Sequence, residues 1–251
     1  MNNKAITYIL KKYYQDYILL INDDAWIHKD FFQGFPKDGK YDVYIPKIYI
    51  SEDLTKAKLS SFGVEYFKSG SVRNANNISL NTTLFSASCV LVRAPFVKHV
   101  INKYNYFFNP ILRSYYEDIE LGIRGLAIGA KYKKVTKMIA YHLGSFTSGK
   151  KSRYTIFMSY RNSLWVIVLC WPVKTIISNI FNIIIVLMWS FIYSSYRFGA
   201  FFYIKIIYLT IINTPLLVRE RKNILSKYNS NFEFNRILSR YKFRTRGGVG
   251  F

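Results

Sequence analysis

The sequence predicts an α/β domain, a mixed sheet flanked by helices, followed by a pair of membrane-associated helices. Three observations lead to this prediction. A helical pattern over residues 4–15 runs directly into an unbroken apolar segment at 17–21, and a helix followed by a buried strand is typical of α/β domains. The run 175–195 contains no charged residue. Finally, 51% of the 251 residues are hydrophobic and 18% are aromatic, which excludes a disordered chain.

The first predicted helix covers residues 4–15, where apolar side chains recur at helical spacing (Ile6, Ile9, Leu10 and Tyr13). The apolar run 17–21 follows and ends abruptly at Asn22. A continuous apolar run of this length is typical of a strand buried on both faces, as in a parallel sheet. We therefore expect this segment to be a strand that is buried on both faces.

Two further strands are predicted at 41–49 and 84–92, because both segments are rich in apolar and aromatic residues. The segment 60–80 lies between them. It is rich in Ser, Asn and Gly, which predicts a loop.

The segment 115–129 has a helical pattern, with apolar residues on one face and Gly129 as a stop signal. A short basic strand is predicted next, around 131–141, and it closes at His142.

The two apolar runs at 175–195 and 198–218 are each long enough to cross a bilayer, which requires about 20 residues. Only Tyr196 and Arg197 separate them, so a helical hairpin is expected. The tail from Arg219 has nine Lys and Arg residues against two Glu, which places both the tail and the first domain on the cytoplasmic side. The alternative is a pair of helices lying in the membrane interface, which polar residues in the runs would favour (Asn179, Asn182 and Lys205).

The formal net charge of +22 indicates an anionic partner. Of the 14 acidic residues, only Glu220 and Glu233 lie beyond position 120, so the second half of the chain is almost purely basic. Its basic residues flank long apolar runs, which favours a membrane surface over nucleic acid. We divide the chain into a domain at 1–160, membrane-associated helices at 161–218 and a basic cytoplasmic tail at 219–251.

Candidate functional residues begin with Asn22-Asp23-Asp24 at the end of the predicted strand. In open α/β sheets, ligands bind beyond the carboxyl ends of strands. Adjacent carboxylates there repel one another, and a divalent cation such as Mg²⁺ or Mn²⁺ relieves that repulsion. The alternative is an ordinary turn that ends the strand, in which Asn and Asp are common.

Glu117 and Asp118 form a second candidate pair, at the start of the helix predicted over 115–129. A carboxylate at a helix start facing a cleft can act as a general base, although acidic residues are also ordinary there because they complement the helix dipole. His142, at the end of the last strand, is either a third metal ligand or a structural histidine. His28, close to the acidic turn, is a minor candidate.

These candidates occur in five short motifs whose order resembles that of the family 2 inverting glycosyltransferases with the GT-A fold, most closely the rhamnosyltransferase-like group. Together the motifs extend over roughly residues 5–165. They are YILLINDDAWIHKDFF at 17–32, FSASCVLVRAP at 85–95, YYEDIELGIRGLAIGAKYKKV at 115–135, AYHLGS at 140–145 and RNSLW at 161–165.

The resemblance implies a role for each candidate. Asp24, the last acidic residue of the first motif, holds Mn²⁺ or Mg²⁺ on the donor diphosphate, with His142 as a metal-side histidine. Asp118, the Asp of the Glu-Asp-x-x-Leu pattern, is the catalytic base. Glu117 orients acceptor or base and Asp23 assists at the donor. The remaining substrate-binding candidate, Arg124, contacts phosphate or simply lies at the surface.

The resemblance therefore implies a Rossmann-like sheet and an enzyme that transfers a sugar, with inversion, from a nucleotide-sugar donor to a lipid-linked or glycan acceptor at the cytoplasmic face of a membrane. The family's initial strand-helix-strand unit has no match in this sequence, so we expect a truncated GT-A domain. A separate polypeptide would then supply the other part of the nucleotide-binding half, and a sheet edge would be exposed where those strands belong.

Two alternatives stay open. One is a non-catalytic or partner-dependent membrane subunit or fragment of a glycosyltransferase, which the unmatched front favours and the retained candidate residues disfavour. The other is a basic nucleic-acid-binding protein, which the uncharged run 175–195 disfavours.

Overall fold

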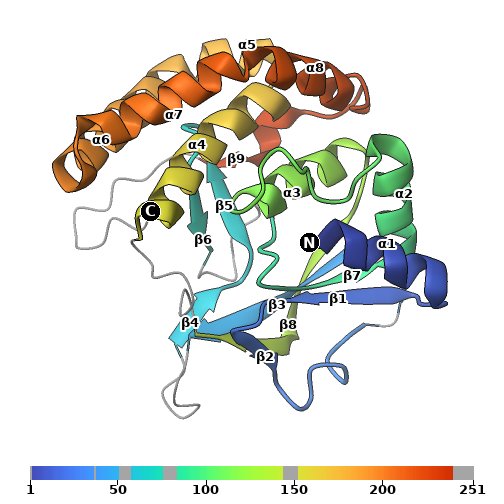
Figure 1. The fold of residues 1–251 in the computed structure, drawn as a ribbon. Coiled ribbons are helices and arrows are strands. Elements are labelled where there is room, and N and C mark those ends of the chain that lie inside the picture. Colours follow the sequence, from blue (N-terminus) through green and yellow to red (C-terminus); the bar gives the residue numbers. More distant parts are fainter. Residues whose placement is uncertain (1, 37, 51–57, 76–83, 144–151, 240–251) are drawn as a thin grey trace.

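The computed structural model describes residues 2–36, 38–50, 58–75, 84–143 and 152–239. The fold is α/β: two sheets are flanked by helices, as the sequence predicts. Figure 1 shows the larger sheet at one end of the molecule and a layer of C-terminal helices at the other.

The larger sheet has the strand order β1-β7-β3-β8-β2, and β4 pairs with the outer part of β3. The pairing of β3 with β8 is parallel and the other pairings are antiparallel, so the sheet is mixed. Its strands are β1 (Tyr17–Ile21), β2 (Ala25–Ile27), β3 (Val43–Ile50), β4 (Lys58–Ser61), β7 (Cys89–Arg93) and β8 (Tyr132–His142).

Strand β1 has the predicted residues, but its pairing differs from the prediction. It lies at the edge of the sheet and pairs antiparallel with β7, rather than in a parallel arrangement. Its apolar run has another cause, because the two faces of the strand contact two different apolar clusters. Ile18 is buried in the main core, whereas Tyr17 and Leu19 pack against a second core on the opposite face.

The prediction of a loop over residues 60–80 is wrong for much of that segment. Strands β5 (Val64–Phe67) and β6 (Val72–Asn74) form a hairpin. Strand β9 (Leu238–Ser239) pairs in parallel with β5 and completes a three-stranded sheet. All four residues of β5 are buried. These strands are short, and β5 depends on a partner far away in the sequence, so local composition does not indicate them.

Three helices accompany the larger sheet: α1 (Asn2–Lys12), α2 (Ala94–Tyr104) and α3 (Glu117–Ala127). Helices α1 and α3 correspond to the helices predicted over 4–15 and 115–129. In α3 the apolar positions Ile119 and Ile123 are buried, and the chain leaves the helix at Gly129, whose φ of +93° favours glycine.

The C-terminal layer contains α4 (Arg153–Cys170), α5 (Val173–Ser178), α6 (Ile180–Phe198), α7 (Ala200–Ile212) and α8 (Thr214–Leu225). Helix α4 packs against α7 and α8, and α6 packs against α7. Helix α4 also continues through residues 160 and 161, so the expected domain boundary falls inside a helix.

The predicted hairpin differs from the structure in two details. Helix α6 continues past Tyr196 and Arg197, and the chain reverses at Gly199, whose φ is +84°. The second apolar run is divided into α7 and α8, which are bent by 63° relative to each other. Among the described residues, α6 is the one helix that is by itself long and apolar enough to cross a membrane, which is weak evidence for membrane association.

Candidate functional site

The turn at Asn22–Asp24 carries the chain from one edge of the larger sheet to the other. The Asn22 amide donates to the carbonyl of Ser88, at 3.0 Å, beside β7. At the other end of the turn, the carbonyl of Asp24 accepts a hydrogen bond from the Leu143 amide, just after β8, at 3.1 Å. The turn therefore lies across the end of the sheet where β1 and β8 finish, which is where open α/β sheets bind ligands.

Asp24 and His142 meet at this end of the sheet, as the resemblance implies. His142 Nε2 is 2.9 Å from Asp24 Oδ1, and both side chains are mostly buried. The backbone fixes this approach, because Ala25, the residue after Asp24, is opposite His142 in the β2–β8 ladder. Asp23, by contrast, is exposed.

A carboxylate and an imidazole side by side suit a divalent cation. The observed separation of 2.9 Å is that of a direct ion pair, and it is also close to the spacing of about 3 Å between two ligands that bind one cation at about 2.1 Å and at right angles. The described residues contain no group of three or more His, Cys, Asp and Glu side chains placed to hold a metal. A cation bound at Asp24 and His142 would therefore need further ligands from substrate or water. His28 is directed elsewhere, with its Nδ1 3.6 Å from an Asp30 carboxylate oxygen.

Asp118 lies in the first turn of α3, with its carboxylate held by two backbone amides. Oδ2 accepts from the Ala87 amide at 3.0 Å, and Oδ1 accepts from the Ile119 amide at 2.8 Å. Desolvation nevertheless raises the pKa of Asp118 above the ordinary value for aspartate. A carboxylate with a raised pKa and a fixed orientation has the properties of a general base.

The two acidic sites are joined by the short segment that precedes β7. Ala87 holds Asp118, and its neighbour Ser88 holds Asn22 at the start of the turn at Asn22–Asp24. Asn22 and Asp118, which are 96 positions apart in the sequence, are thus fixed to the same segment before β7, which belongs to a third motif.

Glu117, the neighbour of Asp118, is an unusual carboxylate. Burial first, and the Asp118 charge second, raise the pKa of Glu117 to about 8. Its Oε2 atom is buried, and no described residue hydrogen-bonds to it. Glu117 is therefore protonated at neutral pH and available to a ligand, and titratable groups perturbed in this way concentrate at functional sites.

Arg161 and Asn162 of α4 hold the loop that leads into α3, and sequence reasoning did not assign them this role. The Asn162 amide nitrogen donates to the carbonyls of Leu112, Ser114 and Tyr115 at 2.9, 2.8 and 2.6 Å. Arg161 donates to the same Leu112 carbonyl at 2.9 Å, and to the Asn162 side-chain oxygen. The RNSLW motif signalled these two residues without indicating their contacts.

The loop held by this pair is conformationally strained. Arg113, Tyr115 and Tyr116 all have φ between +65° and +68°, in the left-handed region that non-glycine residues rarely adopt. Each such residue costs about 1–3 kcal/mol, and such residues persist only where surrounding contacts hold them. Tyr116 immediately precedes Glu117, so this strained backbone sets where the acidic pair begins.

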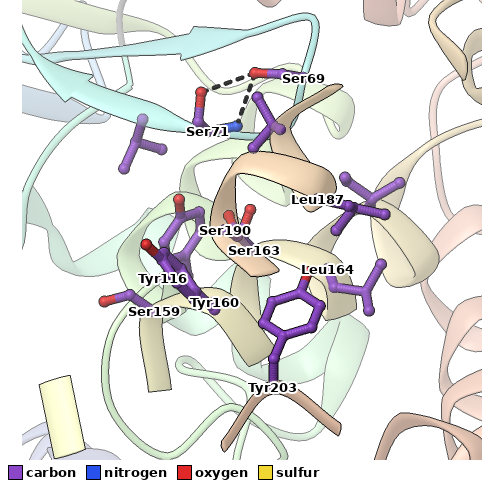
Figure 2. Close-up of a pocket in the computed structure, with 13 residues that line it drawn as sticks. Ser69, Ser71, Tyr116, Ser159, Tyr160, Ser163, Leu164, Leu187, Ser190 and Tyr203 are labelled. Atoms are coloured by element: carbon purple, nitrogen blue, oxygen red, sulfur yellow. Dashed lines mark hydrogen bonds between the residues drawn. The ribbon is translucent and has the colours of Figure 1, made fainter. Parts of the chain in front are cut away.

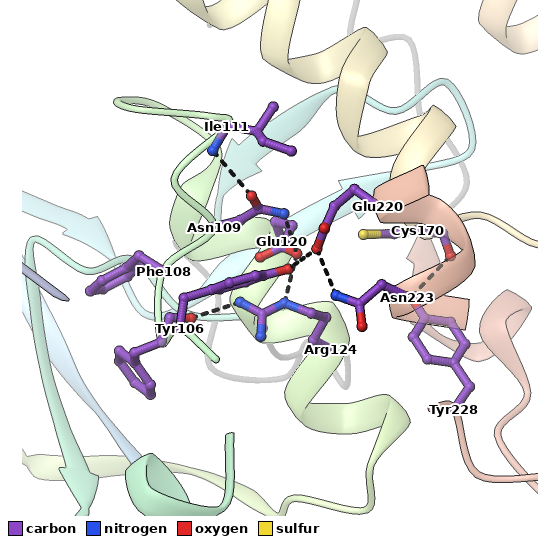
Figure 3. A network of polar contacts seen from close by, with 12 residues as sticks. Tyr106, Phe108, Asn109, Ile111, Glu120, Arg124, Cys170, Glu220, Asn223 and Tyr228 are labelled. Carbon is purple, nitrogen blue, oxygen red and sulfur yellow. Dashed lines mark hydrogen bonds and ion pairs between the residues drawn. The ribbon is translucent and has the colours of Figure 1, made fainter. Parts of the chain in front are cut away.

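Arg124 does not lie in this site, contrary to the expectation that it contacts substrate or lies at the surface. Its side chain is 0% exposed, as is that of Glu120, one turn earlier, and the two are 2.6 Å apart. Figure 3 shows the network around them, in which Arg124 also donates to the carbonyl of Phe107 and Tyr106 hydrogen-bonds to Glu220 of α8. The guanidinium stacks on Tyr106 as well, at 4.8 Å from the ring centre. Arg124 thus links α3 to the loop that follows α2, and Tyr106 of that loop contacts α8.

Comparison with known proteins adds no relative from which a function could be transferred. No protein-family model matches the chain, and no curated protein matches it. Function is therefore inferred from the side chains that the fold brings together.

Proposed function

We propose that this chain is the catalytic part of a membrane-attached, metal-dependent inverting glycosyltransferase of the GT-A type. The observation that supports this most is the connection of the paired side chains of Asp24 and His142 to Asp118, a carboxylate with a raised pKa, through the segment before β7. The donor is a nucleotide-sugar, and the acceptor is a lipid-linked or other glycan hydroxyl.

In this proposal the residues of the chain divide the reaction between them. Asp118 accepts the proton of the acceptor hydroxyl while that oxygen attacks the anomeric carbon of the donor sugar. The bond from that carbon to the phosphate oxygen breaks, and its electron pair leaves with the nucleoside diphosphate. Attack opposite the leaving group inverts the anomeric configuration. Glu117, protonated at neutral pH, donates a hydrogen bond to acceptor or donor oxygen.

Asp24 Oδ1 and His142 Nε2 would hold the cation, and a bound Mn²⁺ or Mg²⁺ would supply electrostatic stabilisation for the charge that develops on the diphosphate. The presence of an imidazole favours Mn²⁺ over Mg²⁺, because magnesium prefers ligand sets made of oxygen alone. Asp23, exposed beside Asp24, is free to approach the donor.

The C-terminal layer supports attachment to a membrane. Helix α6 meets the length and composition of a membrane-crossing helix, and large apolar side chains are exposed along α6 and α7 (among them Phe181, Ile185, Trp189, Phe201 and Ile211). An exposed apolar surface of this kind marks a membrane or protein contact. We propose that α6 and α7 form a membrane hairpin with the catalytic domain on the cytoplasmic face, because the flanking segments are basic.

A partner-dependent subunit is the second candidate, and strand β1 favours it. Among the described residues, β1 pairs with β7 alone, so its other edge has no strand partner. The sequence YILLI contains no charge and no proline, which are the usual protection of a free edge. A further polypeptide segment carrying strands of the nucleotide-binding half would pair there.

The test is turnover of a panel of nucleotide-sugars by the full chain in lipid nanodiscs, with Mn²⁺ or with a chelator. We expect nucleoside diphosphate release that needs the metal and that Asp118→Asn reduces by about 10²–10⁴-fold. Asp30→Asn, an exposed aspartate outside the site, is the matched control and should retain full activity. Metal-independent turnover, or equal turnover in the two variants, would reject the mechanism.

A further inference from the structure

A small cavity lies between the hairpin of β5 and β6 and the C-terminal helices. It has a volume of about 80 Å³, room for several water-sized groups. Figure 2 shows that its walls come from distant parts of the chain: Ser69 and Ser71 from the hairpin, Ser163 from α4 and Tyr203 from α7. Catalytic domain and apolar helices therefore form this cavity together.

The lining is rich in hydroxyl groups and contains no ionisable acid or base other than tyrosine. Eight of the thirteen lining residues are serine or tyrosine, and the other five are aliphatic. A chain with a net charge of +22 could easily place a lysine or arginine beside an anionic ligand, yet none lines this cavity. Such a lining suits an uncharged group that both donates and accepts hydrogen bonds while an apolar part lies alongside.

One wall residue of the cavity is a sequence neighbour of the acidic pair. Tyr116 forms part of its wall and is the residue directly before Glu117. Burial, assisted by the charge of Asp118, raises the pKa of Tyr116 to about 12, so the tyrosine stays a neutral hydroxyl and is electrostatically close to the proposed base. On its other side the cavity is bounded by Val186 and Leu187 of α6, the helix with the composition of a membrane span.

We infer that this cavity receives the uncharged, hydroxyl-bearing head group of a membrane lipid acceptor, with the lipid chain lying along α6 and α7. The inference rests on the proposed function, and it adds where the acceptor binds and that the bound part is neutral. A phosphate-bearing head group does not fit a lining without a cationic side chain.

Binding of hexyl glucoside to the full chain in zwitterionic nanodiscs tests the inference, with hexyl phosphate for comparison. Leu187→Trp fills the cavity, and Ile184→Trp on the exposed side of the same helix is the matched control, since Ile184 is 44% exposed. We expect Leu187→Trp to weaken glucoside binding at least tenfold and Ile184→Trp to leave it unchanged. Equal binding by both variants, or tighter binding of hexyl phosphate to the wild type, would overturn the inference.

A second variant keeps the test decisive if Leu187→Trp does not fold. Ser159→Ala removes one lining hydroxyl without adding volume, and we expect glucoside affinity to fall about threefold to tenfold. Unchanged affinity would count against the site.

Hydrolysis of the donor by water separates this inference from the proposed function. Leu187→Trp should retain slow, metal-dependent donor hydrolysis while losing transfer to hexyl glucoside. If no donor is turned over by the wild type, the proposed function fails, whereas the binding comparison still decides the cavity.

Discussion

The side-chain amide of Asn162 donates a 2.6 Å hydrogen bond to the backbone carbonyl of Tyr115, two residues before Glu117. Asn162 lies in the helix that packs against the C-terminal layer, and Tyr115 lies in the strained entry to the acidic pair. Helix α4 and the loop before the acidic pair are thus connected by Asn162 together with Arg161.

Asn162→Asp should disturb this connection with little change in volume. The carboxylate cannot donate, so it faces three carbonyl oxygens without a hydrogen bond, and we expect a loss of about 2–4 kcal/mol in unfolding free energy. If Asn162 positions Asp118, kcat should fall about 10–100-fold while KM for the donor changes less than about threefold, and the acid limb of the pH–rate profile should move. Asn235→Asp, at an exposed position after α8, is the control. A stability loss with an unchanged kcat and pH profile would limit Asn162 to a structural role.

The raised pKa of Glu117 predicts a pH-dependent stability. The folded state keeps the Glu117 proton up to about pH 8, whereas the unfolded chain releases it near pH 4.5, so folding is favoured most at low pH. This contribution is lost as pH rises through 8. The unfolding free energy should therefore decrease by about 2–4 kcal/mol between pH 5 and pH 9 because of this group. Glu117→Gln should flatten that dependence in thermal unfolding. An equal slope in wild type and variant would contradict the assignment.

The buried pair of Glu120 and Arg124 predicts strongly non-additive stabilities. Glu120→Gln leaves an unpaired guanidinium in the core and should destabilise by about 3–5 kcal/mol, because a buried charge then lacks its counter-charge. Replacing both, with Glu120→Leu and Arg124→Met, should recover most of that loss. The double variant should also retain its turnover per folded molecule, since neither residue reaches the site. Chemical unfolding measures the first effect. Loss of donor turnover in a folded double variant would restore a substrate role for Arg124.

Metal affinity should depend on Asp24 and His142 together. Asp24→Asn and His142→Gln should each weaken Mn²⁺ binding about 10–100-fold. The double variant should bind Mn²⁺ only slightly more weakly than the single variant with the lower affinity, because the two residues share one ion. Titration followed by electron paramagnetic resonance, in the presence of nucleoside diphosphate, measures these affinities. His28→Gln is the matched control, because it changes a histidine that lies away from the pair. Unaltered Mn²⁺ affinity in both single variants would place the cation elsewhere.

Elements with a strong local pattern were predictable from the sequence. The segment 17–21 is unmistakably a strand, and α3 has apolar residues at helical spacing together with an acidic first turn. The edge position of β1 was not predictable, because an apolar run reports that both faces are covered and not which strands are neighbours. The hairpin at Val64–Asn74 was missed for a related reason, since its strands have three or four residues each.

The candidate site was predictable in part. The resemblance implied that Asp24 and His142 lie together, and the structure brings the two side chains together. The burial of Arg124 was not predictable, because its partners come from the loop after α2 as well as from its own helix. The role of Asn162 was not predictable either. Its hydrogen bonds are to backbone carbonyls, which every residue has, so the residue types in the contacted loop do not indicate them.

The parallel pairing of Tyr66 with Leu238 has a consequence for the order in which the chain is made. These residues are about 170 positions apart, so the small sheet cannot close until nearly the whole chain has left the ribosome. By then α6 and α7 have already emerged, and if they form the proposed membrane hairpin they enter the bilayer before the last strand arrives. Under the proposed function, anchoring at the membrane therefore precedes closure of the small sheet.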